Sequence, residues 1–192
     1  MRNKLAALGL FVLSGCISFG SEPPPYLLTL TSAATVPAAT SRTAAAGEAI
    51  TVVTPTVPQA LATARVPVVS NGTAIAYVKD AQWVDTPNAL FGRLLSETIA
   101  ARTGRVVLDP RQFSFDPGIR LTGQLQSFGV DSDSMEAIVL YDAALARGAD
   151  RVETRRFEAR VPVAVVETAA VGTALNQAAN QVATDVAAWI GG

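Results

Sequence analysis

The alternation of hydrophobic and polar residues is clearest in the second half of the chain. Residues 119–128 and residues 152–163 each place apolar side chains at alternate positions, whereas residues 137–145 between them are apolar at both odd and even positions. Alternation with a period of two is typical of strands that bury one face, and a continuous apolar run is typical of a central strand. The pattern predicts three long strands, the last of them paired with the one before it.

Shorter apolar segments indicate further strands in the first half of the chain. They are residues 26–30, 49–54, 66–69, 74–79 and 105–108. Asn71-Gly72 separates the third and fourth of these segments, and Asn-Gly is a strong signal for a tight hairpin. Residues 31–47 are rich in Ala, Thr and Ser without apolar periodicity, which predicts a flexible loop.

Two segments have the apolar periodicity of helices. The first begins with Thr86 as N-cap and Pro87 at the first helical position, and Gly104 ends it. The second runs from about Glu167 to Ile190, and its many alanines permit close approach to a sheet. Their apolar faces comprise Leu90, Phe91, Leu94, Leu95 and Ile99 in the first, and Val171, Leu175, Val182, Val186 and Trp189 in the second. The elements together predict an α/β fold, a single-domain sandwich of a mixed, mostly antiparallel sheet with two main helices.

The first fifteen residues have the pattern of an export signal. Two basic residues precede a short apolar stretch, residues 5–13, and Leu13-Ser14-Gly15-Cys16 then resembles the bacterial lipobox. The apolar stretch is about half of the roughly 20 residues that a transmembrane helix needs. Cys16 is the only cysteine, so it has no intramolecular disulfide partner. We predict a signal peptide over residues 1–15, cleavage between Gly15 and Cys16, and acylation of Cys16 with fatty acids such as palmitate.

Residues 16–25 form a short tether between the acylated cysteine and a domain of residues 26–192. Pro23-Pro24-Pro25 cannot form a helix and favours an extended spacer, which reaches roughly 30 Å from the bilayer. Ile17 follows the cysteine where, in enterobacterial sorting, an aspartate would retain a lipoprotein in the inner membrane. We therefore predict the periplasmic face of the outer membrane. Because sorting rules differ among bacteria, the inner membrane stays open as an alternative.

The composition argues against catalysis and against nucleic acid as a partner. The chain has no histidine, which removes the commonest general base and metal ligand, and its single cysteine is used for acylation. Asp131 and Asp133 form the one tight acidic pair, in a Ser-rich turn, and the turn preferences of Asp and Ser favour a capping role over carboxylate catalysis. The net charge is −1 before the basic signal peptide is removed, so there is no basic footprint. We expect no enzymatic activity, no metal and no cofactor.

Arginine and tryptophan residues each allow a structural and a functional interpretation. Five arginines along residues 147–160 are interleaved with acidic residues, which favours cross-strand ion pairs over a site for anionic lipid or a partner. Trp83 and Trp189 flank the predicted helices and favour packing roles. We keep Trp83, Arg156 and Arg160 as candidate contacts with a partner or a lipid.

A series of short motifs resembles one protein family along nearly the whole mature chain. The motifs are the lipobox, Tyr26-Leu27-Leu28, Val57-Pro58-Gln59-Ala60-Leu61 followed by Arg65, Ile75-Ala76-Tyr77, Ala81-Gln82-Trp83, Leu94-Leu95, Leu121-Thr122-Gly123-Gln124-Leu125-Gln126-Ser127-Phe128, Arg156-Phe157 and Ala188-Trp189-Ile190. In this order the sequence resembles the ABC-type transport auxiliary lipoproteins, the PqiC-like group associated with MCE-domain lipid transport systems.

The resemblance implies a non-enzymatic part of a transporter that spans the cell envelope. In such a system an inner-membrane permease and ATPase supply energy, an MCE-domain protein forms a hydrophobic conduit, and the lipoprotein docks it at the outer membrane. The implied cargo is phospholipid or another hydrophobic molecule, the implied fold is similar to the N-terminal domain of TolB, and self-association into a ring is an extension of this model. The alternative is a free-standing envelope lipoprotein that binds peptidoglycan or an outer-membrane assembly complex.

Overall fold

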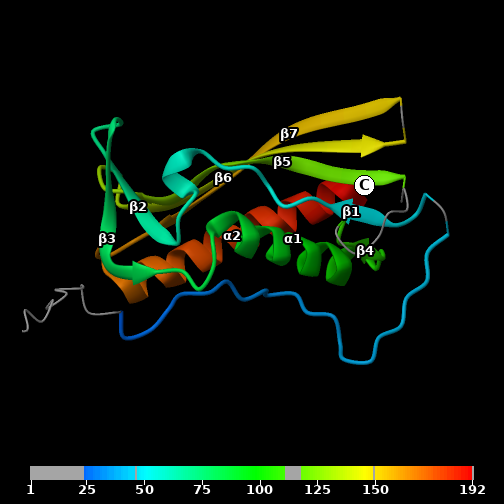
Figure 1. Ribbon diagram of the computed structural model, residues 1–192, viewed down its shortest axis with the longest axis horizontal. Helices are drawn as coiled ribbons and strands as arrows, with labels where there is room; N and C mark the ends of the chain where they lie inside the picture. Colours follow the sequence, from blue (N-terminus) through cyan, green and yellow to red (C-terminus); the bar gives the residue numbers. More distant parts are fainter. Residues whose placement is uncertain (1–23, 46, 111–117, 149, 192) are drawn as a thin grey trace, which may run out of the picture.

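A computed structural model describes residues 24–45, 47–110, 118–148 and 150–191 (Figure 1). The predicted signal peptide, Gly15, Cys16 and most of the tether lie outside the described residues. No helix within the described ranges is both long enough and apolar enough to cross a bilayer.

Three long strands form the body of a seven-stranded sheet, as the alternating sequence pattern predicts. They are β5 (Ile119–Asp131), β6 (Glu136–Arg147) and β7 (Arg151–Pro162). β6 lies between β5 and β7 and is antiparallel to both. β6 and the second half of β7 each place alternate side chains in the core, which confirms the period-two pattern there.

Both ends of β5 carry additional strands. β1 (Ile50–Val52) pairs parallel with the first part of β5, and β4 (Val107–Leu108) pairs parallel with β1. β2 (Arg65–Ser70) pairs parallel with the last part of β5 and forms an antiparallel hairpin with β3 (Ala74–Gln82). The predicted Asn-Gly hairpin is therefore confirmed, and β5 is shared by two small groups of strands.

A bulge in β5 keeps its apolar side chains on one face. The pairing of β5 with β6 shifts between Leu125 and Ser127. Before the bulge Ile119, Leu121 and Leu125 are buried, and after it Phe128 is buried at the other parity. An inserted residue of this kind bends a strand and increases its twist. The buried side chains of β5 therefore stay on one face of the sheet, although they have odd residue numbers before the bulge and an even number at Phe128 after it.

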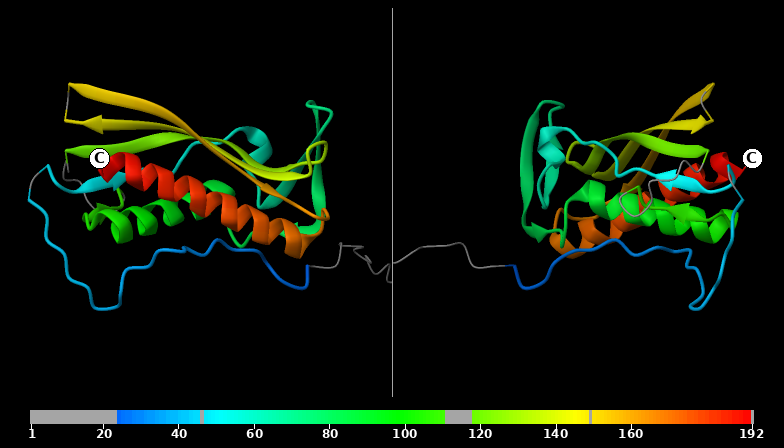
Figure 2. Two further views of the ribbon diagram at one scale, coloured as in Figure 1. Left: turned by 180° about the vertical axis from the view of Figure 1, so that it is seen from behind. Right: turned by 45° about the vertical axis from the view of Figure 1, so that its right-hand side comes forward.

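The two predicted helices cover one face of the sheet (Figure 2). α1 (Pro87–Thr103) ends at Gly104, which adopts the left-handed conformation with φ 71°, and α2 is Thr168–Gly191. The N-cap prediction is only half right: Thr86 is the cap residue, but its side chain makes no capping bond, and its hydroxyl donates to the adjacent Asp85 carboxylate at 3.4 Å. A short 3-10 helix, η1 (Gln59–Leu61), precedes β2.

The segment before β1 differs from its prediction. Of residues 26–30, Leu28 alone makes a strand-like bridge, to Trp83, so the predicted first strand is wrong. Residues 31–45, here called the strap, have no regular structure but lie along the helices (Figure 2). Asn176 and Asn180 of α2 accept hydrogen bonds from strap backbone N–H groups at 2.9 and 2.8 Å, and Arg42 donates to the Ala100 carbonyl at the end of α1. The predicted flexible loop is therefore an anchored segment.

Candidate docking surface

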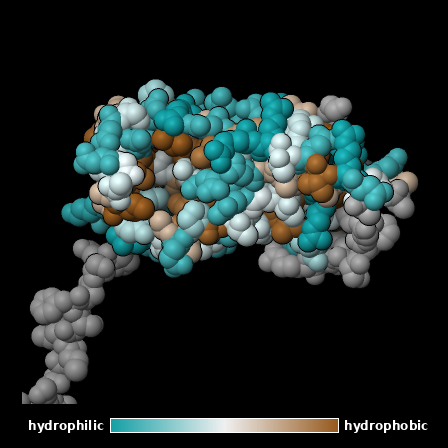
Figure 3. All heavy atoms as spheres, turned by 90° about the horizontal axis from the view of Figure 1, so that it is seen from above, coloured by the Kyte–Doolittle hydropathy of each residue, from teal (hydrophilic) through white to brown (hydrophobic). Residues whose placement is uncertain are grey.

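The face of β5, β6 and β7 that points away from the helices has no covering layer within the described chain (Figures 1 and 3). We call it the helix-free face. Hydrophilic side chains are spread over it, with hydrophobic ones between them (Figure 3). Because the helices bury only one face of the sheet, every second residue of these strands is available for contact with another molecule.

The middle strand contributes apolar side chains to the helix-free face. Ile138 and Leu140 of β6 are half-buried on this side, whereas Val139 and Tyr141 point into the core. This arrangement explains why residues 137–145 are apolar at both parities: β6 is central, as predicted, but only one of its faces is fully covered. Ile138 and Leu140 thus give this otherwise polar face a small apolar centre.

A bidentate ion pair crosses the same face. Arg156 of β7 lies directly opposite Asp142 of β6, and its guanidinium donates two hydrogen bonds to the Asp142 carboxylate at 2.6 and 2.7 Å. Gln126 donates to the same carboxylate at 3.1 Å. Mainly through its hydrogen bond, Arg156 lowers the pKa of Asp142 below its usual range. The carboxylate therefore stays ionised and holds the arginine in a fixed orientation.

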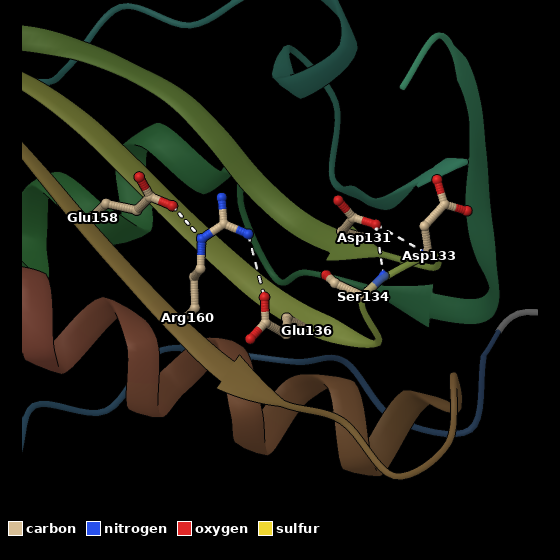
Figure 4. Close-up of polar contacts among 6 residues, drawn as sticks. All are labelled: Asp131, Asp133, Ser134, Glu136, Glu158 and Arg160. Carbon is tan, nitrogen blue, oxygen red and sulfur yellow. Dashed lines mark hydrogen bonds and ion pairs between the residues drawn. The ribbon is translucent and has the colours of Figure 1, made fainter. Parts of the chain in front are cut away.

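A second group of charges lies further along β7 (Figure 4). Arg160 donates to the carboxylate of Glu158 on its own strand and to that of Glu136 on β6, the latter at 3.2 Å. These two acidic partners raise the pKa of Arg160, whose charge is permanent in any case. The cross-strand ion pairs expected from the sequence are confirmed at Arg156 and Arg160. Whether either arginine contacts a partner stays a prediction.

The acidic pair after β5 caps a turn (Figure 4). The Asp131 carboxylate accepts hydrogen bonds from the backbone N–H groups of Asp133 and Ser134 at 2.9 and 3.2 Å. Asp133 accepts one from the backbone N–H of Asn71 at 2.8 Å, which joins this turn to the β2–β3 hairpin. The capping interpretation of the pair is confirmed. The described residues contain no group of three or more potential metal-ligating side chains.

An apolar groove of about 270 Å³ opens where the β2–β3 hairpin meets the helix-free face. Pro58 and Leu61 line one side, Pro67 and Ile75 of the hairpin line another, and Ile138 of β6 forms part of the floor. Gly129 of β5 also lines it, and a methyl group there would lie 2.8 Å from Pro67 Cγ. A glycine is needed at this point because the hairpin packs directly on the strand.

Trp83 and Trp189 have packing positions. Trp83 is 1% exposed and its ring centroid is 5.4 Å from that of Phe128. Its indole N–H has no hydrogen-bond partner within the described part of the chain. Trp189 is half-buried with its ring centroid 5.6 Å from that of Phe157. The packing interpretation therefore holds for both residues, and a direct contact of Trp83 with a partner or acyl chain stays a prediction.

Sequence reasoning did not find the role of Gly123 and Tyr141. A methyl group on Gly123 would lie 2.6 Å from the Tyr141 hydroxyl oxygen, so the ring occupies the space that a side chain would take. The buried hydroxyl donates to the Thr122 carbonyl at 3.2 Å, and burial raises the pKa of Tyr141 well above its usual value. A glycine inside an alternating strand is the signal for such a close approach.

The fold of the chain is similar to those of known protein structures. The crystal structure of an uncharacterized protein has a TM-score of 0.66 and 15% sequence identity, and the match covers 86% of this chain and 96% of that chain. A Xanthomonas campestris protein labelled DUF330 has a TM-score of 0.66 and 20% identity, with 86% and 93% of the two chains covered. A search of curated proteins finds no match. The family model for the ABC-type transport auxiliary lipoprotein component matches residues 26–187, and the chain belongs to this family.

Proposed function

We propose that the protein is a lipoprotein of the periplasmic face of the outer membrane that assists an MCE-type ABC transporter without catalysing a reaction. The transporter would move phospholipid or another hydrophobic molecule between the membranes. The observation that carries this proposal is the family match over residues 26–187. The lipobox ending at Cys16 supports the membrane anchor.

The helix-free face is the part of the domain best suited to hold a partner. It combines the half-exposed Ile138 and Leu140 with fixed ion pairs and an adjacent apolar groove. An apolar centre with a polar surround is the usual anatomy of a protein–protein interface. The partner in this proposal is the MCE-domain protein, which an inner-membrane permease and ATPase accompany.

The domain acts in this proposal as a rigid collar around the end of the hydrophobic conduit. Its groove of about 270 Å³ is smaller than the roughly 300 Å³ lower limit of common ligand pockets. This groove therefore does not enclose a lipid path by itself, and in the proposal several copies surround the path. Self-association into a ring belongs to the proposal for this reason.

Co-purification from cells tests the proposal directly. The full-length lipoprotein, solubilised from membranes in mild detergent, is captured and its partners and bound lipids are identified by mass spectrometry. We expect the MCE-domain protein, the permease and phospholipid. Recovery of peptidoglycan or outer-membrane assembly proteins in their place would favour a free-standing envelope lipoprotein. Fractionation of the membranes then checks the predicted outer-membrane location.

Charge variants locate the docking surface within the same experiment. Arg156→Gln with Arg160→Gln removes the fixed guanidinium groups of the helix-free face, and we expect loss of MCE-domain protein from the captured complex. Arg151→Gln is the matched control, since Arg151 pairs with Glu153 on its own strand beside the β6–β7 turn. If the double variant captures as much partner as the control, these two arginines are structural only.

A further inference from the structure

Exposed apolar side chains gather at the end of the molecule where the chain arrives from Cys16. Tyr26, Leu27, Val84 and Val165 are each between 43% and 55% exposed, and we call them the tether-end patch. A folded domain normally shows large apolar side chains singly. Four at one end therefore point to a contact that the described chain does not itself supply.

Backbone contacts bring these residues together although they come from three parts of the sequence. The Leu28 N–H donates to the Gln82 carbonyl and the Val84 N–H donates to the Leu28 carbonyl, both at 2.8 Å, which sets Leu28 beside Trp83, so Leu27 and Val84 lie on neighbouring segments, one residue to either side of this pair. The Leu28 side chain lies on α2, 2.7 Å from where a methyl group on Gly172 would be. Val165 comes just before α2 begins. The start of the described chain, the end of β3 and the start of α2 lie at one end of the molecule in all views (Figures 1 and 2).

A shallow apolar hollow extends the patch. It has a volume of about 370 Å³ and lies between the end of β7 and the first turns of α2. Val163 and Ala164, next to Val165, line it together with alanines of α2. The hollow therefore continues the mostly apolar surface beside Val165.

The length of the tether limits what the patch can meet. About eight peptide steps separate Cys16 from Pro24, so even a fully extended tether reaches at most roughly 30 Å. An acylated Cys16 keeps its fatty acids in the bilayer. The tether-end patch, which includes Tyr26 and Leu27, is thus the exposed apolar surface nearest to the tether along the chain.

We propose that the tether-end patch rests on the same bilayer that holds the lipid of Cys16, with its apolar side chains at the boundary between headgroups and acyl chains. The inference depends on the acylation in the proposed function. Tyrosine and small apolar side chains are suited to this boundary. Lys79, Asp80, Asp85 and Glu167 are exposed close to the patch in the chain, and Arg65 pairs with Gln82, so these residues sum to a net charge of −1 and the surface that the patch fits is zwitterionic.

Contact at this end fixes the direction of the domain. The helices and long strands run along the long axis of the molecule, and the β6–β7 turn and the C-terminus lie at the opposite end (Figure 1). With the patch on the bilayer, the end that carries the β6–β7 turn points away from the membrane. The helix-free face then lies parallel to the membrane normal and is accessible to a conduit from the periplasm.

Single-cysteine labelling tests the contact, because acylation uses the only native cysteine. Leu27→Cys, Val84→Cys and Val165→Cys are introduced into the full-length lipoprotein and coupled to an environment-sensitive fluorophore. Val152→Cys is the control, a valine that is 65% exposed at the far end of the molecule. Each labelled protein is reconstituted into vesicles of phosphatidylethanolamine and phosphatidylcholine that contain lipids with a quencher in the acyl chain.

We expect a blue shift and a loss of fluorescence for the three patch labels and no change for the label at position 152. At low salt, replacing part of the phosphatidylcholine with anionic phosphatidylglycerol should reduce the quenching, and added salt should restore it. Acylated, vesicle-bound protein whose patch labels are quenched no more than the control overturns the inference but leaves the anchor intact. Protein that is not acylated and does not bind vesicles refutes the anchor itself.

Discussion

Gly123→Ala tests how tightly β5 and β6 pack at the glycine of the Leu-Thr-Gly-Gln-Leu motif. A methyl group on this residue would lie 2.6 Å from both the Cε2 carbon and the hydroxyl oxygen of Tyr141, and closer still to the Asp142 carbonyl oxygen. Real methyl groups do not approach other atoms so closely. Either Tyr141 leaves its position or the two strands separate, and both changes weaken the core.

The magnitude follows from what Tyr141 would lose. Its hydroxyl bond to the Thr122 carbonyl contributes about 1 kcal/mol, and its edge contact with Phe91, with ring centroids 5.3 Å apart, contributes about 1 kcal/mol more. Strain from an added methyl group in a packed core is typically about 1–3 kcal/mol. Displacement of Tyr141 would thus cost about 2 kcal/mol and retained strain about 1–3 kcal/mol, so we expect Gly123→Ala to lower the free energy of unfolding by about 1–3 kcal/mol.

Urea unfolding of the purified mature protein, followed by circular dichroism, measures this loss. Gly191→Ala is the matched control, because its methyl group would meet only Thr103 Cγ2 at an ordinary 3.7 Å. The penalty for glycine applies to the middle of a helix, and Gly191 is the last residue of α2, so the control should be close to neutral. A loss below about 0.5 kcal/mol for Gly123→Ala, the range of an ordinary surface change, would refute the close packing.

Three further predictions concern ionisation and the strap. The raised pKa of Tyr141 means that the folded state favours its neutral form. The contribution of this group to the free energy of unfolding is therefore complete below about pH 10 and is lost at higher pH. Tyr141→Phe should make the free energy of unfolding fall less steeply in alkaline titrations. The lowered pKa of Asp142 acts in the opposite direction, with stability present above about pH 4 and lost in acid, so Asp142→Asn should reduce the acid dependence of unfolding while weakening the tie to Arg156. Asn180→Ala removes the acceptor for a strap N–H and the donor to the Thr31 carbonyl, and hydrogen exchange should become faster in the strap but not in β6; equal protection in both proteins would show that the strap is held by other contacts.

The long strands and both helices could be predicted because their signals are local. Alternation in β5 and β7 reports which face each strand buries, and Gly104 marks the end of α1 by its left-handed conformation. The β6–β7 register is also nearly local, since a short turn fixes it and places Arg156 opposite Asp142. The ion pair of the candidate surface was therefore within reach of sequence reasoning.

Other features depend on contacts between distant parts of the chain. The strap has no apolar periodicity in its sequence. Two of its backbone N–H groups donate to the side chains of Asn176 and Asn180 of α2, and not to a neighbouring strand. The bulge after Leu125 is invisible in a pattern that counts parity from one end of β5. In each case the sequence contains the right residue types, but only the tertiary fold decides which of them pair.

Membrane attachment and partner binding occupy different parts of this fold, and that separation makes the two roles distinguishable. The tether-end patch lies beside the start of α2, whereas the arginines of the helix-free face lie on a strand of the opposite layer. If one apolar surface served both roles, binding of lipid and binding of the partner protein would exclude each other. With two surfaces, the charge variants of β7 should release the partner yet leave the labels near Val84 quenched by lipid. Simultaneous loss of both signals in the charge variants would mean that the partner, and not the bilayer, orients the domain.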